Sequence, residues 1–304
     1  MISILTSVVL PVFAVTAVGY LSGKLRLFSE SDAVAINKFV FFISLPALVF
    51  WLVASVDFGD FPWRLVLGVL TVEFMAYGVA IMLILLVFKR ELPEAVLLGL
   101  AATYPNHVLF VQPIAVILFG EGVTIPITAI IVIDTTIIFG VTVVMMDTFS
   151  VTQRSPVRLL KQYAKNPFIL AIAAGWIASL GGIHIPSGIE LYLKFSGRAA
   201  APAGLFALGI LLSLRPAFAS PALPLTVTLV KVVAQPLIAS VVLMQYLDFE
   251  KAVAIPALMV AAGPSALTSF VLAVNYKVRV DAIAQSIIFT VVAALFSLSI
   301  VAAL

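Results

Sequence analysis

An apolar stretch at residues 93–119 decides the fold, and it reads PEAVLLGLAATYPNHVLFVQPIAVILF. It is long enough to cross a bilayer, whose hydrocarbon core takes about 20 helical residues. Near its middle stand Pro105, Asn106 and His107. A proline inside a helix removes a backbone hydrogen bond and clashes with the preceding turn. The sequence therefore predicts a membrane-spanning helix that is broken at Pro105.

A second apolar stretch, residues 251–275, carries a similar interruption and reads KAVAIPALMVAAGPSALTSFVLAVN. Pro264 lies about as far into this stretch as Pro105 lies into the first. Asn106 and Ser265 follow the two prolines, where helix-capping side chains are expected. A packing kink explains a single proline, but two interruptions in matching positions favour a transporter binding site near the membrane midplane.

The composition of the whole chain is that of a polytopic membrane protein. Its 304 residues are 63% hydrophobic and 10% charged, with a mean hydropathy of +1.24. An average soluble domain is about 45–50% apolar and about 25% charged. This excludes an ordinary cytosolic enzyme, a nucleic-acid binder and a disordered protein. The lack of cysteine excludes disulfides, thiol catalysis and Cys-ligated metals.

Breaking the chain at charge and Gly/Pro clusters predicts an all-α fold of ten transmembrane helices. The expected spans are Ile2–Ser22, Ala33–Ser55, Arg64–Phe88, Pro93–Phe119, Val123–Met145, Pro167–Gly182, Leu191–Leu214, Pro221–Tyr246, Lys251–Asn275 and Val280–Leu304. Eleven basic residues lie in the odd-numbered loops and two in the even-numbered loops. The positive-inside rule therefore places both termini outside the cell membrane, and residues 151–166 form a basic cytoplasmic loop.

The two halves of the chain match at a shift of 156 residues. This shift carries residues of the first half onto identical residues of the second: Pro11 onto Pro167, Gly19 onto Gly175, Lys38-Phe39 onto Lys194-Phe195, Pro46-Ala47 onto Pro202-Ala203 and Phe50 onto Phe206. Each repeat, 1–150 and 167–304, then holds five spans. An odd number of spans inverts the second copy in the membrane, which is typical of secondary transporters and also occurs in some channels.

Three charged residues fall near one depth inside expected spans, namely Glu73, Asp134 and Lys231. A charge at the centre of a membrane helix costs about 2.5–3.5 kcal/mol, so each needs a reason. A structural ion pair of Glu73 with Lys231 is one explanation, and a coupling or support cluster beneath the crossing is the other. Two acids and one lysine leave a surplus negative charge that a shared proton would remove, so a proton is a candidate coupling ion.

The candidate substrate site gathers the residues around the two breaks: Pro105, Asn106, His107, Gln112, Pro264 and Ser265. Each break exposes the N-terminus of a second half-helix, whose partial positive charge favours an anion. His107 is either structural or a donor to that anion. No nucleotide-binding loop, metal-ligand spacing or catalytic triad is visible, so we expect a non-enzyme without cofactor or metal.

The chain resembles the auxin efflux carrier family, the bacterial relatives of the plant PIN proteins. The resemblance rests on short motifs in the family's order: Asn37-Lys38 through Pro46-Ala47-Leu48, Asn106 with Pro113, Leu118-Phe119-Gly120-Glu121, Asn166-Pro167, Pro202 through Phe206-Ala207-Leu208-Gly209, Lys231 with Pro236, and Pro264-Ser265-Ala266 with Leu272-Ala273. The chain departs from the family after the first crossover, where His107, Val108 and Val111 replace small residues.

The resemblance implies a five-plus-five inverted repeat like that of bile-acid sodium symporters, with two broken, crossing helices. Spans one, two, six and seven would form a scaffold, and spans three to five and eight to ten a mobile transport domain. It also implies elevator-type transport of small organic anions, such as auxin, malate or malonate, by a homodimer. One alternative is a sodium-coupled symporter of the bile-acid type, which needs cation ligands at the crossover, where Lys231 would substitute for a sodium charge. The other is a channel or a membrane sensor.

Overall fold

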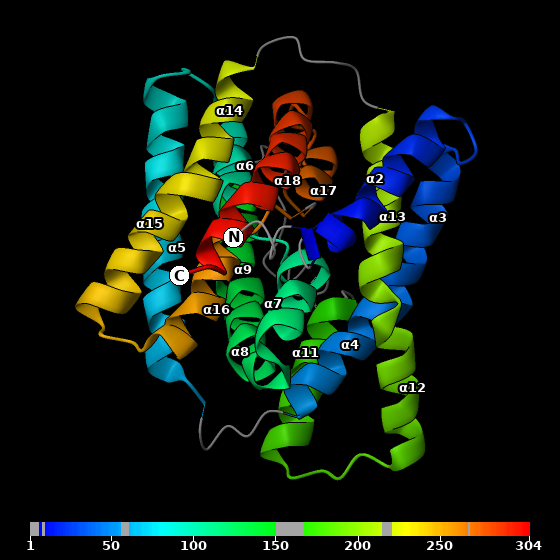
Figure 1. Cartoon of the computed structure of the whole chain (residues 1–304). Coiled ribbons are helices and arrows are strands. Elements are labelled where there is room, and N and C mark those ends of the chain that lie inside the picture. The colour runs from blue at the N-terminus through cyan, green and yellow to red at the C-terminus, as the bar shows by residue number, and fades with distance from the viewer. Residues whose placement is uncertain (1–5, 8–9, 56–60, 150–166, 215–220, 267) are drawn as a thin grey trace. The chain divides into compact units, whose positions relative to one another are not determined.

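The computed structural model describes residues 6–7, 10–55, 61–149, 167–214, 221–266 and 268–304, and the named elements in them are all helices (Figure 1). They fall into two compact units. Unit 1 comprises Met1–Leu10, Trp63–Gln153 and Ala217–Leu304, and unit 2 comprises Pro11–Pro62 and Arg154–Pro216. The expected basic loop at 151–166 lies outside the described residues.

Unit 1 holds both interrupted helices. In its first half, the elements are α5 (Trp63–Leu86), α6 (Leu92–Thr103), η4 (His107–Val111), α7 (Gln112–Phe119), η5 (Glu121–Val123), α8 (Thr124–Ile133), η6 (Asp134–Ile138) and α9 (Phe139–Phe149). In its second half they are α14 (Ala222–Leu229), η7 (Val230–Ala234), α15 (Gln235–Ser240), η8 (Val241–Tyr246), α16 (Lys251–Ala262), α17 (Thr268–Asn275) and α18 (Asp281–Val301). Helix α6 is buried from Glu94 to its end at Thr103, so it forms the centre of this unit.

Unit 2 is built from helices of both halves of the chain. Its elements are α2 (Leu10–Lys24, from Pro11 on), α3 (Glu30–Phe39), η2 (Val40–Ser44), α4 (Leu45–Ala54), α11 (Pro167–Leu180), α12 (Ser187–Arg198) and α13 (Ala200–Ser213). Helix α4 packs against α11 and α12, and α13 packs against α3. Ser29 starts α3 with a capping box, because its hydroxyl accepts from the Asp32 N–H while Asp32 accepts from the Ser29 N–H.

Among the residues that the structure describes, six helices are long and apolar enough to cross a membrane: Glu30–Ala54, Trp63–Leu86, Glu121–Met146, Ser187–Ser213, Ala222–Tyr246 and Asp281–Val301. Shorter apolar helices account for most of the remaining expected spans. Spans four and nine are short because each is divided in two at its break. Span six is short because α11 ends at Leu180, two residues before Gly182 turns the chain with a positive φ of 58°.

Small residues let the helices of unit 2 approach closely. Gly19 of α2 lies against the backbone carbonyl of Phe206, so that a Cβ at this position would clash with that oxygen. Gly175 of α11 lies in the same way against α4, where a Cβ would come within 3.2 Å of the Phe50 carbonyl oxygen. Close backbone approach of this kind is a main source of association between helices in lipid.

We expect Gly19→Ala to lower the midpoint of thermal unfolding in detergent by several degrees, because overpacking costs about 1–3 kcal/mol. Gly78→Ala in α5 is the matched control, since an added Cβ meets no atom within 4 Å there. This control should be neutral or slightly stabilising, because alanine favours a helix by up to about 1 kcal/mol over glycine. Equal unfolding midpoints for the two variants would contradict the close packing of α2 on α13.

Candidate functional site

The first helix break runs from Tyr104 to Asn106. Helix α6 ends at Thr103, and Tyr104 is extended, with φ −77° and ψ 107°. The Asn106 side chain caps the next segment, because its Oδ1 accepts a hydrogen bond from the Leu109 N–H at 3.3 Å. The chain then continues as the π-helical turn η4 and as α7, whose early proline fits the first turn of a helix.

The second break has the same form. Helix α16 ends at Ala262, and Gly263 is extended, with φ −68° and ψ 163°. Pro264 and Ser265 follow, and α17 begins at Thr268. Gly263 has no room for a side chain, because a Cβ would clash with Val111 of η4.

The two breaks pair with each other through their backbones. The Asn106 N–H donates to the Pro264 carbonyl at 2.8 Å, and the Ala266 N–H donates to the Tyr104 carbonyl at 3.0 Å. Pro105 and Ser265 thereby form an antiparallel bridge. Unwound backbone inside a membrane protein must find hydrogen-bond partners within the protein. Each break therefore supplies one backbone donor and one backbone acceptor to the other.

The carbonyl groups that end the two first half-helices are bonded by side chains. In α6, Ala101 accepts from the Ser265 hydroxyl and Thr103 from Gln235 Nε2 at 3.1 Å; in α16, Ala261 accepts from Lys231 Nζ and Ala262 from the Ser297 hydroxyl, each at 2.7 Å. The partial negative charges of both C-termini are therefore met by protein donors.

Lys231 is fully buried, and its partners differ from the expected one. Its Nζ donates to Gln235 Oε1 at 2.8 Å and to the Ala261 carbonyl, while no ion pair within 4.0 Å joins it to Glu73, although both side chains are described. The structural ion pair of Glu73 with Lys231, one of the two explanations considered, is therefore not formed as a direct contact. The physical reason is that Gln235 lies one turn further along the same helical segment and that a helix C-terminus attracts a cation.

The third feature is a cluster of Glu73, His107 and Asp134, all buried to 4% exposure or less. His107 Nε2 lies 2.5 Å from Asp134 Oδ2, and one ligand atom from each of the three residues lies within 4.8 Å of the other two. Both oxygens of Glu73 and Oδ1 of Asp134 have no hydrogen-bond partner. His107 belongs to both the crossing and this cluster, because it directly follows the capping residue Asn106.

The remaining predicted residues also lie in unit 1, buried at the breaks: Pro105, Pro264, Ser265 and Gln112, the last at the start of α7. Sequence reasoning missed three residues at the breaks. Gln235 and Ser297 donate to the ends of the first half-helices, and the Thr290 hydroxyl accepts a hydrogen bond from the Ser265 N–H at 3.1 Å. Gln235 could have been found from its spacing of four residues after a buried lysine. A serine or threonine in an apolar helix carries no comparable signal.

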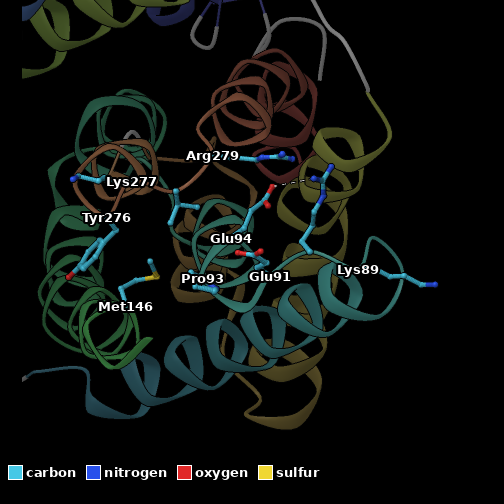
Figure 2. Close-up of a pocket in the computed structure, with 10 residues that line it drawn as sticks. Lys89, Glu91, Pro93, Glu94, Met146, Tyr276, Lys277 and Arg279 are labelled. Atoms are coloured by element: carbon cyan, nitrogen blue, oxygen red, sulfur yellow. Dashed lines mark ion pairs between the residues drawn. The ribbon is translucent and has the colours of Figure 1, made fainter. Parts of the chain in front are cut away.

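A cavity of about 450 Å³ lies elsewhere in unit 1, at the start of α6 (Figure 2). Its lining includes four basic residues, Lys89, Arg90, Lys277 and Arg279. Arg90 pairs with Glu94 at 3.8 Å, and Figure 2 shows Lys89 extending away from that pair. None of the predicted site residues lines this cavity.

Comparison with known proteins places this geometry in a family. Residues 4–302 match the family described as "Membrane transport protein". The chain is 25% identical over 291 residues to a protein of Rhizobium meliloti named "Putative malonate transporter", covering 94% of this chain and 91% of the relative. It is 27% identical over 213 residues to the "Uncharacterized transporter YfdV" of Escherichia coli K12, covering 67% of each chain.

The expected resemblance to the auxin efflux carriers is thereby confirmed, because the match extends over nearly the whole chain. Long apolar helices and this family together make the protein a multi-pass membrane protein. The chain belongs to the membrane transport protein family of the auxin efflux carriers.

Proposed function

We propose that the protein is a secondary transporter of small organic anions, mono- or dicarboxylates such as malonate or malate, which bind where the two broken helices cross. The observation that carries this proposal is the asymmetry of the crossing. Protein donors already bond the C-terminal carbonyls of both first half-helices. At the start of η4 the Asn106 side chain caps the Leu109 N–H, and the N–H groups of His107 and Val108, which have no intrahelical acceptor, remain to favour an anion.

Two further observations support a carboxylate as the substrate. The relative from Rhizobium meliloti is named for malonate. The basic residues around the cavity of Figure 2 create a positive potential, which raises the local concentration of anions.

We also propose the ten-span inverted repeat, in the cell membrane with both termini outside. The backbone supports it, because the residues with positive φ form three pairs at nearly one spacing: Arg26 with Gly182 (156 apart), Lys89 with Asp248 (159 apart) and Gly120 with Lys277 (157 apart). The packing of Gly19 on Phe206 and of Gly175 on Phe50 supports it too. A shift of 156 residues converts each of these contacts into the other with its partners exchanged, as a two-fold axis would.

Transport would proceed by elevator-type alternating access, with unit 1 as the transport domain and unit 2 as the scaffold of a homodimer. The division of the chain supports this assignment, since unit 2 gathers spans two, six and seven with the part of span one from Pro11 on, and unit 1 gathers the other six spans with the first residues of span one. The two breaks and the charged cluster all lie in unit 1, so they would move together.

A sodium-coupled mechanism is the alternative, and the position of Lys231 favours transport without sodium. Its ammonium bonds the Ala261 carbonyl at the end of a half-helix, where a bound cation would otherwise be stabilised. Lys231 would therefore take the place of a sodium ion at this carbonyl.

For the binding site, we expect the Asn106→Ala, Ser265→Ala double variant to raise the KM for malonate about tenfold in proteoliposomes, which corresponds to about 1.4 kcal/mol. The reason is that this variant loses the Asn106 cap of η4 and the hydrogen bond from the Ser265 hydroxyl to the Ala101 carbonyl. Ser299→Ala is the matched control, because Ser299 is as buried as Ser265 but bonds only its own helix. Unchanged transport by the double variant would contradict the site.

For the topology, single cysteines can be introduced without background, since the chain contains none. On intact cells, a membrane-impermeant thiol reagent should label Gly188→Cys, at the start of α12 on the side expected outside, and leave Ser31→Cys, at the start of α3, unlabelled until the cells are opened. Both positions are exposed. Labelling with the opposite pattern would show that the orientation is reversed.

For the cation, replacing sodium by potassium on both sides of the liposome membrane should leave malonate uptake unchanged. Lys231→Ala should reduce uptake, because two buried acceptors lose their donor at about 1–3 kcal/mol. The exposed Lys38→Ala is the control. Uptake that requires sodium in the wild type would refute the substitution of sodium by Lys231.

A further inference from the structure

We propose that Glu73, His107 and Asp134 form a proton-binding site and that the protein moves a carboxylate and a proton in the same direction. This inference rests on the proposed function, and it names the coupling ion of that transport. The three side chains come from three separate elements of unit 1, α5, η4 and η6, which converge on one buried point.

Two of these residues begin π-helical turns. His107 is the first residue of η4 and Asp134 the first of η6. Lys231 lies on a third such turn, η7. Turns of this kind are rare and are frequently found at functional sites, where they direct side chains that a regular helix would not place.

The short contact between His107 and Asp134 requires a proton between the two atoms. At 2.5 Å, Nε2 and Oδ2 are at hydrogen-bond distance. Two atoms that bind one metal at about 2.0–2.2 Å in tetrahedral geometry lie well over 3 Å apart, so this pair is not arranged as metal ligands. The unpartnered oxygens of Glu73 and Asp134 offer further positions for a proton nearby.

The charge of the cluster explains why one proton matters. Besides its three members, the titratable groups of the described residues that face it are Lys231 from η7 and Tyr104, whose ring contacts His107 and whose hydroxyl bonds Thr135 of η6. Two carboxylates, one ammonium and a neutral histidine carry a net charge of −1. One added proton, on the histidine or on a carboxylate, makes the buried group neutral, which is far less costly inside a membrane.

The same charge sets the direction of coupling. His107 directly follows Asn106, so the cluster adjoins the half-helix N-terminus where the anion would bind. The unprotonated cluster repels a carboxylate, whereas the neutral cluster does not. Proton binding therefore strengthens anion binding, and by linkage the anion strengthens proton binding by the same factor. Positive linkage between two ligands on one carrier produces symport.

The test uses purified full-length protein in liposomes, with the membrane potential clamped and a pH-sensitive dye inside. An inward proton gradient should accelerate wild-type malonate uptake at least fivefold, and malonate should carry protons inward. Glu73→Gln, which mimics the protonated acid, should lose this acceleration and lower the ratio of protons to malonate moved. Asp134→Asn should behave likewise. Glu190→Gln, an exposed acid of unit 2, should behave as the wild type.

The outcomes distinguish a failure of the proton site from a failure of the proposed transport function. Saturable wild-type malonate uptake without proton movement overturns the proton site and leaves the proposed function standing. Uptake that needs an added metal ion, or that a chelator abolishes, overturns it in favour of a cation site. No uptake of any carboxylate refutes the proposed function itself. If the variants do not fold, the ratio of protons to malonate moved by the wild type decides the question alone.

Discussion

The rest of unit 1 depends on the backbone pairing between the two helix breaks. Two N–H groups and two carbonyls that would be unsatisfied in an apolar interior bond each other across the crossing. An unpaired polar group in hydrocarbon costs several kcal/mol. Each break therefore supplies backbone partners to the other, and an interruption in one helix alone would leave these groups without them.

This mutual dependence fixes the chemistry around the crossing. Once the breaks are held together, the side chains of Ser265, Gln235, Lys231 and Ser297 can reach the ends of the first half-helices. These donors bond the C-terminal carbonyls, and the proposed anion would bind at the N-terminal ends. The crossing also brings His107 beside Asp134, which joins the proposed anion site to the proposed proton site.

The positions of the breaks could be predicted from the sequence, because Pro105 and Pro264 lie at matching places near the middle of two apolar stretches and each is followed by a polar residue, whereas Pro256 lies within the continuous helix α16. The family could be predicted as well, from weak motifs in a consistent order.

The hydrogen-bond partners of Lys231 could not be predicted, because the bounds of an expected span give the depth of a residue but not the rotation of its helix, which decides what the side chain faces. The meeting of His107 with Asp134 was equally hidden, since it depends on the π-helical turns at both residues. Among the described residues, six helices are long enough to span a membrane where ten spans were expected, because the breaks divide spans four and nine and α11 ends early, at Leu180.

An experimental structure of the protein in a lipid bilayer with bound malonate tests the central claim most directly. The account predicts that both helices remain interrupted and that malonate lies at the crossing, with a carboxylate within hydrogen-bond distance of the backbone N–H groups that follow Asn106. Malonate bound only in the basic cavity beside Arg279, or helices that run unbroken through Pro105 and Pro264, would contradict it.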